Sequence, residues 1–123
     1  DSVIVALKTL QSFDTKGKKI VVLGDMRELG EASKREHTNT GVIAAEMNFE
    51  RLLTFGPFSK YTSEAFGAKA QHYESKEELA NELKKTLTDG DVILIKGSRG
   101  IKMEEVVNRL MNDNDSLKTK DQH

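Results

Sequence analysis

The sequence contains no cysteine, so neither a disulfide framework nor a thiolate metal site can form. It has no apolar run close to the roughly 20 residues that a membrane-spanning helix needs, and we find no signal peptide in it. Acidic and basic residues nearly balance, at a formal net charge of -1, which argues against nucleic acid or an anionic membrane as the main partner. We therefore expect a cytoplasmic protein.

Two common nucleotide-binding motifs are also missing. Neither the phosphate loop Gly-x-x-x-x-Gly-Lys-Ser/Thr nor the dinucleotide pattern Gly-x-Gly-x-x-Gly occurs. The histidines His37, His72 and His123 show no metal-ligand spacing, and no Ser/His/Asp arrangement is visible. We therefore predict no metal ligand and no catalytic residue within this chain.

What the sequence does contain is an alternation of helical and strand patterns. Short apolar runs at 20–23, 51–55, 69–73 and 92–95 predict strands, and segments with helical apolar spacing lie before, between and after them. Strands that alternate with helices predict an α/β fold, here a three-layer α/β/α arrangement around a mostly parallel, Rossmann-like sheet. A length of 123 residues suits one compact domain, which we assign to residues 1–123.

The predicted helix starts are marked by serines. Ser33 and Ser75 each open a Ser-x-x-Glu capping box, and Ser59 can cap a short helix. The first helix begins directly after Asp1 without an initiator Met, so we expect a fragment of a longer protein, made by design or by proteolysis. The polar segment 112–123 is expected to be a disordered tail.

Two polar, glycine-containing loops follow predicted strands, at 24–31 and 96–100. Parallel strands place such loops on one edge of a sheet, where they can line one ligand cleft. In the second loop, Lys96 and Arg99 supply positive charge, Ser98 supplies a hydroxyl donor, and Gly97 permits close approach to an anion. The same residues suit a solvated turn with a helix cap equally well.

The first loop is more ambiguous. Asp25 can bind an ammonium group, a ribose hydroxyl or a metal-bound water, but its residue type fits a cap of the turn at least as well. Glu28 and Glu31 suit surface charges, and His37 is more often a packed helix residue than a ligand.

These two loops resemble the third, C-terminal domain of the Mur ligase family. The resemblance rests on 22–31 followed by His37 and Gly41, and on 95–99 followed by 103–107, in the family's order and separation. It covers nearly the whole chain to about Met111, although the stretch from about 48 to 89 carries little family signal. The residues at 24–26 and 96–99 resemble the branch of the family that uses D-alanyl-D-alanine.

The resemblance implies an ATP-dependent, Mg²⁺-dependent ligase of peptidoglycan synthesis. Such an enzyme phosphorylates the terminal carboxylate of UDP-N-acetylmuramoyl-tripeptide, and the amino group of D-alanyl-D-alanine then attacks the acyl phosphate. The N-terminal and central domains of the same chain hold the UDP-linked substrate, the phosphate loop and the metal. The fragment alone is expected to be inactive and to bind no cofactor.

The resemblance also implies where substrate is bound. We expect Lys96, Gly97, Ser98 and Arg99 to lie beside the dipeptide carboxylate or the reacting phosphates, with Asp25 and Met26 as second choices. His37 and Glu28 are expected to support the loop around Asp25.

Other functions remain open at this point. A free-standing nucleotide- or phosphate-binding α/β module would bind ATP by itself. A sister Mur ligase would add a different amino acid and carry other residues at 96–99. A receiver-like signalling domain fits poorly because the predicted strand at 51–55 ends without an Asp.

Overall fold

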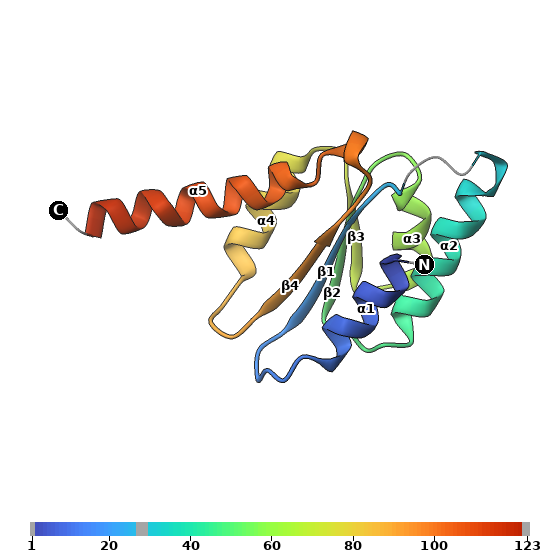
Figure 1. Ribbon diagram of the computed structural model, residues 1–123, viewed down its shortest axis with the longest axis horizontal. Coiled ribbons are helices and arrows are strands. Elements are labelled where there is room, and N and C mark those ends of the chain that lie inside the picture. Colours follow the sequence, from blue (N-terminus) through green and yellow to red (C-terminus); the bar gives the residue numbers. More distant parts are fainter. Residues whose placement is uncertain (1, 27–29, 122–123) are drawn as a thin grey trace.

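A computed structural model describes the backbone of residues 2–26 and 30–121, and the side chains of residues 2–26 and 30–112. Helices and strands alternate as the sequence predicts (Figure 1). In chain order they are α1 (Ser2–Ser12), β1 (Lys19–Gly24), η1 (Gly30–Ala32), α2 (Ser33–Ala45), β2 (Arg51–Phe55), α3 (Ser59–Phe66), β3 (Ala70–Tyr73), α4 (Lys76–Thr86), β4 (Val92–Lys96), η2 (Arg99–Ile101) and α5 (Glu104–Asp121).

The four described strands form one sheet in the order β3-β2-β1-β4, and every neighbouring pair is parallel. All four carboxyl ends therefore lie on the same edge of the sheet, at the top of Figure 1. We call this the carboxyl edge, and the opposite edge, where the strands begin, the amino edge. The predicted α/β fold with a parallel sheet is confirmed.

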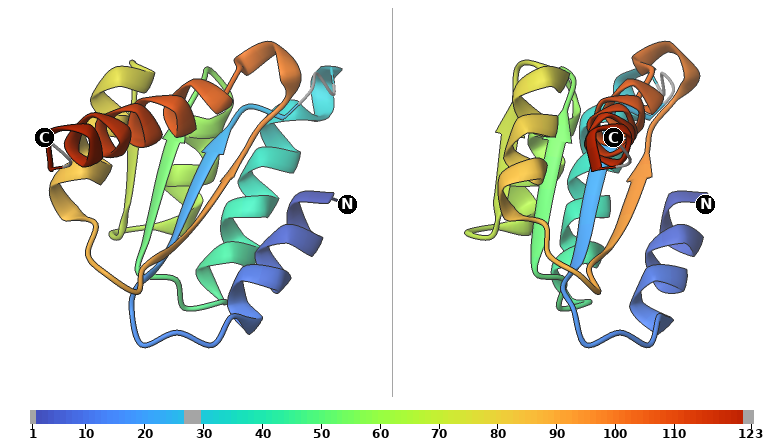
Figure 2. Two further views of the ribbon diagram at one scale, coloured as in Figure 1. Left: turned by 60° about the vertical axis from the view of Figure 1, so that its left-hand side comes forward. Right: turned by 90° about the vertical axis from the view of Figure 1, so that its left-hand side faces the viewer.

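Two apolar clusters, one on each face, hold the sheet between two layers of helices (Figure 2). On one face, Val21, Leu23 and Leu52 pack against α1 and α2. On the other face, Ile20 and Val22 pack against α4 and the start of α5. Alternate residues of β1 serve opposite clusters because successive side chains of a strand point to opposite faces.

The two most apolar strands differ in burial. Residues 20–24 of β1 are all buried, whereas every residue of β4 is only half-buried. The difference follows from their places in the sheet, since β1 is central and β4 has one described neighbour. The continuous apolar run predicted both strands correctly, but it did not distinguish a central strand from an edge strand.

The predicted helix starts are right in position but not always in mechanism. Ser75 is a true cap, because its Oγ accepts hydrogen bonds from the backbone N–H groups of Glu77 and Glu78. The capping box at Ser33 is wrong: Ser33 is the first residue of α2, and the preceding Ala32 is already in the helical region because η1 leads directly into the helix. Ser59 likewise begins α3 without capping it.

Helix α5 continues beyond the end that the sequence predicts. Its backbone is helical to Asp121, and in Figure 1 this long helix extends away from the sheet. No Gly or Pro interrupts 104–121, although Asn and Asp at 112–115 are poor helix formers. Disorder of 112–123 in solution stays a prediction. None of the described helices is both long and apolar enough to cross a membrane.

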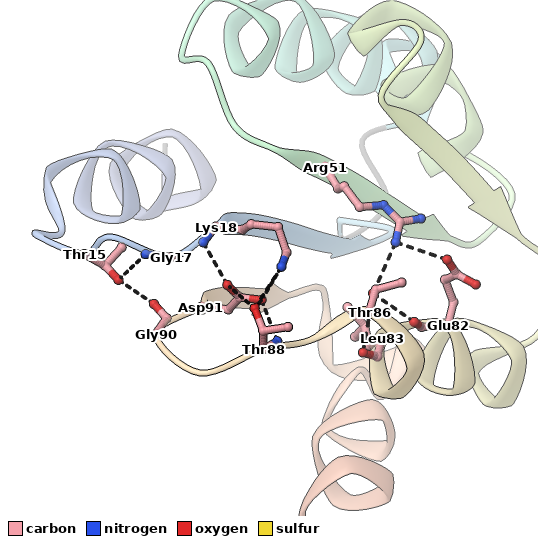
Figure 3. A network of polar contacts seen from close by, with 10 residues as sticks. All are labelled: Thr15, Gly17, Lys18, Arg51, Glu82, Leu83, Thr86, Thr88, Gly90 and Asp91. Atoms are coloured by element: carbon pink, nitrogen blue, oxygen red, sulfur yellow. Dashed lines mark hydrogen bonds and ion pairs between the residues drawn. The ribbon is translucent and has the colours of Figure 1, made fainter.

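A polar network joins two loops at the amino edge (Figure 3). The Asp91 carboxylate accepts hydrogen bonds from the backbone N–H of Lys18, at 2.8 Å, and of Thr88, at 2.9 Å, and it forms an ion pair with Lys18 Nζ at 3.0 Å. These backbone donors and the Lys18 ammonium lower the pKa of Asp91 from 3.8 to about 2. Thr15 adds a hydrogen bond from its hydroxyl to the Gly90 carbonyl.

Candidate functional site

The two predicted site loops meet at the carboxyl edge. β1 and β4 are adjacent parallel strands, so the loops that follow them begin side by side. The backbone N–H of Ser98 donates to the Asp25 carbonyl at 2.8 Å, which joins the loops directly. The prediction that both loops share one edge is therefore correct.

Gly24 and Gly97 allow the two loops to lie close to each other and to Ile101, the last residue of η2. A Cβ on Gly24 would lie 2.6 Å from Met103 Cγ, and a Cβ on Gly97 would lie 2.7 Å from the same atom. Ile101 Cγ2 would be 2.8 Å from either Cβ. The space beside both glycines is thus filled by Ile101 and Met103, which cover the junction of the loops.

The basic residues of the second loop have no ionic partner among the described side chains. Lys96 is half-buried at the end of β4, and Arg99 is exposed at the start of η2. Neither forms an ion pair or a side-chain hydrogen bond with any residue in 2–26 or 30–112. Two cations that have no partner among these residues, beside the Ser98 hydroxyl, are groups of the kind that can hold a carboxylate or a phosphate.

An open hollow of about 350 Å³ adjoins this loop. It is lined by Ile95, Lys96, Gly97, Ser98, Arg99, Met103, Glu104 and Val107. Asp25 and Met26 are not in this lining, and the Met26 side chain packs against the cluster on the opposite face of the sheet. The loops therefore share an edge, but the single cleft expected from the sequence does not form between their described side chains.

The Asp25 carboxylate lies at the start of α3. It accepts hydrogen bonds from the backbone N–H of Phe58 at 3.1 Å, from the N–H of Ser59 at 2.7 Å, and from Ser59 Oγ at 2.8 Å. Its residue is only 8% exposed. Gly56, at φ +120°, leaves the room that this carboxylate occupies. Asp25 thus caps the N-terminus of a helix that begins more than thirty residues later.

His37 connects α2 to the same loop. The backbone N–H of Met26 donates to His37 Nε2 at 3.1 Å, and His37 Nδ1 lies 2.6 Å from the Ser33 carbonyl. A carbonyl only accepts, so this geometry fits the tautomer with its proton on Nδ1. The His37 ring stacks on Phe58 at a centroid distance of 5.8 Å. These contacts are what the predicted supporting role requires, and that role stays a prediction.

Sequence reasoning missed Lys76. The ammonium group of this residue, in the first turn of α4, donates to the Ile101 carbonyl at 2.9 Å and forms an ion pair with Glu105 at 2.8 Å. The hydrogen bond from Lys76 holds the pKa of Glu105 below its usual value. One signal was available: a lysine at a helix N-terminus opposes the helix dipole, which suggests a partner outside its own helix.

The remaining predicted residues add no metal site. Glu28 lies outside the described residues. Within the described part of the chain, no three His, Asp or Glu side chains gather in a way that can hold a metal ion. His72 instead pairs with Thr54 Oγ1 at 2.8 Å, and burial lowers its pKa. The described residues therefore do not fit a Mg²⁺ site.

Comparison with known proteins finds relatives along most of this chain. The chain is 34% identical over 117 residues to the UDP-N-acetylmuramoyl-tripeptide--D-alanyl-D-alanine ligase of Bacillus subtilis, covering 89% of this chain and 25% of that protein. It is 38% identical over 96 residues to the Escherichia coli enzyme of the same name, covering 76% and 21%. The chain thus spans about a quarter of the length of these curated relatives.

Solved structures give the same result. The MurF ligase of Thermotoga maritima in complex with ADP matches with a TM-score of 0.76 at 26% identity, covering 94% of this chain and 26% of that one. A MurF structure from Acinetobacter baumannii matches with a TM-score of 0.77 at 26% identity, covering 90% and 25%. The family model described as "Mur ligase, glutamate ligase domain" matches residues 1–99. The chain therefore belongs to the Mur ligase family.

Proposed function

We propose that this chain works as the C-terminal domain of a cytoplasmic, ATP-dependent ligase that joins D-alanyl-D-alanine to UDP-N-acetylmuramoyl-tripeptide. The curated relatives carry that activity in their names. The observation that carries the proposal is that Lys96 and Arg99, which have no ionic partner among the described residues, lie beside the Ser98–Asp25 hydrogen bond that joins the two loops.

In this proposal the second loop binds an anion. Lys96 and Arg99 hold the carboxylate of the dipeptide or the phosphate oxygens, and Ser98 donates a hydrogen bond. Whether the bound group is the carboxylate or the phosphate, the positive charges of Lys96 and Arg99 then lie beside its negative charge. The two residues therefore act by orienting the substrate and by electrostatic stabilisation.

The first loop has a supporting part in the proposal. Because the Asp25 oxygens already accept hydrogen bonds from Phe58 and Ser59, we expect Asp25 to act by holding the loop that carries Met26. His37 holds the same loop through the Met26 N–H.

In the full-length protein, ATP would supply the phosphate that activates the tripeptide carboxylate, and Mg²⁺ would neutralise the charge of the phosphates. We assign the phosphate loop and the metal ligands to other domains of the full-length protein, because this sequence has no phosphate loop and its described side chains gather no ligand set.

The test is an Arg99→Ala substitution in the full-length protein that carries this chain. Loss of a charged contact to the substrate should lower kcat/KM about 10- to 100-fold. A rise in KM for the dipeptide assigns Arg99 to its carboxylate, whereas a rise in KM for ATP or a fall in kcat assigns it to the phosphates. Steady-state kinetics with each substrate varied in turn gives these values.

Lys16→Ala is the matched control, because it removes an exposed positive charge at the amino edge. It should leave all constants unchanged. Unchanged constants for Arg99→Ala as well would remove Arg99 from the site. A full-length protein that does not join the dipeptide to the tripeptide substrate would overturn the proposed function itself.

A further inference from the structure

We propose that Lys76 is a positioning residue for this site, which holds the turn between η2 and α5 and thereby fixes Ser98 and Arg99. The inference rests on the proposed function, because it assigns Lys76 a part in placing the anion-binding loop. Lys76 itself lies outside the residues that line the hollow beside that loop.

The ammonium group of Lys76 joins elements that are distant in sequence. It donates to the Ile101 carbonyl at 2.9 Å and to the Lys102 carbonyl at 3.4 Å, and it pairs with Glu105 at 2.8 Å. It also lies 5.5 Å from the centre of the Phe55 ring at the end of β2. One side chain therefore connects the start of α4 to the turn, to α5 and to the carboxyl end of β2.

The turn that Lys76 holds is tied directly to the anion-binding loop. The backbone N–H of Ile101 donates to the Ser98 carbonyl, and the N–H of Lys102 donates to the Arg99 carbonyl, each at 3.2 Å. Lys102 has φ +54°, an uncommon conformation for a residue with a side chain. The two carbonyls that accept from Lys76 are that of Lys102 itself and that of the preceding Ile101, so the ammonium group stabilises the turn at its least favourable residue.

The contacts to the carbonyls carry this role more than the ion pair does. The Lys76 side chain is 18% exposed, whereas the Glu105 side chain is 49% exposed and well hydrated. Exposed ion pairs stabilise little, but removal of the donor leaves the Ile101 carbonyl, whose hydrogen bond is partly buried, without compensation. We therefore expect loss of Lys76 to have a much larger effect than loss of the Glu105 charge.

The kinetic test uses Lys76→Met, which keeps an apolar side chain beside Phe55 and removes the ammonium group. In the full-length ligase, KM should rise roughly tenfold for the same substrate whose KM Arg99→Ala raises, because a small displacement of a binding group is costly. Lys76→Arg should restore most of this loss. Glu105→Gln, and Lys85→Met as a matched charge removal on an exposed residue of the same helix, should change KM less than twofold, roughly.

Two outcomes would overturn the inference. One is that Lys76→Met gives the constants of Lys85→Met. The other is that kcat falls with every KM unchanged, in proportion to the loss of folded protein, which is the mark of a purely structural residue. Rescue by Lys76→Arg together with a KM change for one substrate supports the positioning role.

A second measurement does not depend on ligase activity. In the 123-residue chain, amide hydrogen exchange at Ile101 and Lys102 should be roughly tenfold faster in Lys76→Met than in Lys85→Met, because both amides belong to the turn. Equal exchange rates would show that Lys76 does not hold the turn. If the full-length protein proves to lack ligase activity, the proposed function fails, and this exchange measurement still decides the part assigned to Lys76.

Discussion

The two edges of the sheet are both rich in glycine and charge, but they use their charges differently. At the amino edge, the Lys18 ammonium and the Asp91 carboxylate are paired with each other, and backbone donors complete the network (Figure 3). At the carboxyl edge, Asp25 accepts from the start of α3 and Lys76 donates to the turn after η2. Lys96 and Arg99, by contrast, have no ionic partner among the described residues.

The comparison shows that the presence of a hollow is a poor guide to a site. The hollow at the amino edge, which Lys16, Lys18 and Asp91 help to line, is about 420 Å³, larger than the 350 Å³ beside Ser98 and Arg99. Yet the central charges of the amino edge neutralise each other, so little is left to attract a ligand. What distinguishes the carboxyl edge is that Lys96 and Arg99, which have no ionic partner among the described residues, lie together in one loop beside Ser98.

The largest effect should come from Asp25→Ala at the carboxyl edge. It leaves the N–H groups of Phe58 and Ser59 without their acceptor and removes the cap of α3. Charged hydrogen bonds and helix caps together suggest a loss of roughly 2–4 kcal/mol in the free energy of unfolding. Denaturant unfolding of the 123-residue chain measures this loss.

Asp89→Ala serves as the matched control, because it removes an exposed carboxylate at the amino edge. Its effect should stay within about 0.5 kcal/mol. If Asp25→Ala lowers the free energy of unfolding no more than Asp89→Ala does, Asp25 does not stabilise the start of α3. Its carboxylate would then be available for a ligand, as in the substrate-binding role predicted from the sequence.

The sequence predicted the strands and the shared edge of the two loops, but not the long-range contacts that Asp25 and Lys76 make. Buried parallel strands are continuous apolar runs, so β1 and β4 can each be recognised from a few consecutive residues. The partners of Asp25 lie 33 and 34 residues away, and the Ile101 carbonyl lies 25 residues from Lys76. Such contacts depend on how loops meet in three dimensions, and no local pattern encodes that.

A smaller effect is expected from Gly17→Ala at the amino edge. A Cβ at Gly17 would lie 2.3 Å from the carbonyl carbon of Gly90, so the two loops must move apart. Overpacking against a backbone costs about 1–3 kcal/mol. Thermal or denaturant unfolding tests the change against Gly100→Ala, since nothing lies within 4 Å of a Cβ at Gly100. Equal stability of the two variants would mean that the amino-edge loops are not in close contact.

The smallest effect, and the one most specific to the amino edge, should appear in the pH dependence of Asp91→Asn. The pKa of Asp91 in the folded chain is about 2, below its ordinary value of 3.8, so the unfolded chain binds this proton first as the pH falls. The stabilisation by Asp91 is therefore complete above about pH 4 and is lost as the pH falls towards 2. Asp91→Asn should be less stable than the parent chain above pH 4, and the difference should shrink below it.

Unfolding by denaturant at several pH values measures this difference, with Asp89→Asn as the control. A difference that stays constant across this range would mean that Asp91 is not ionised more readily in the folded chain, and that the backbone donors and Lys18 do not favour its charged form.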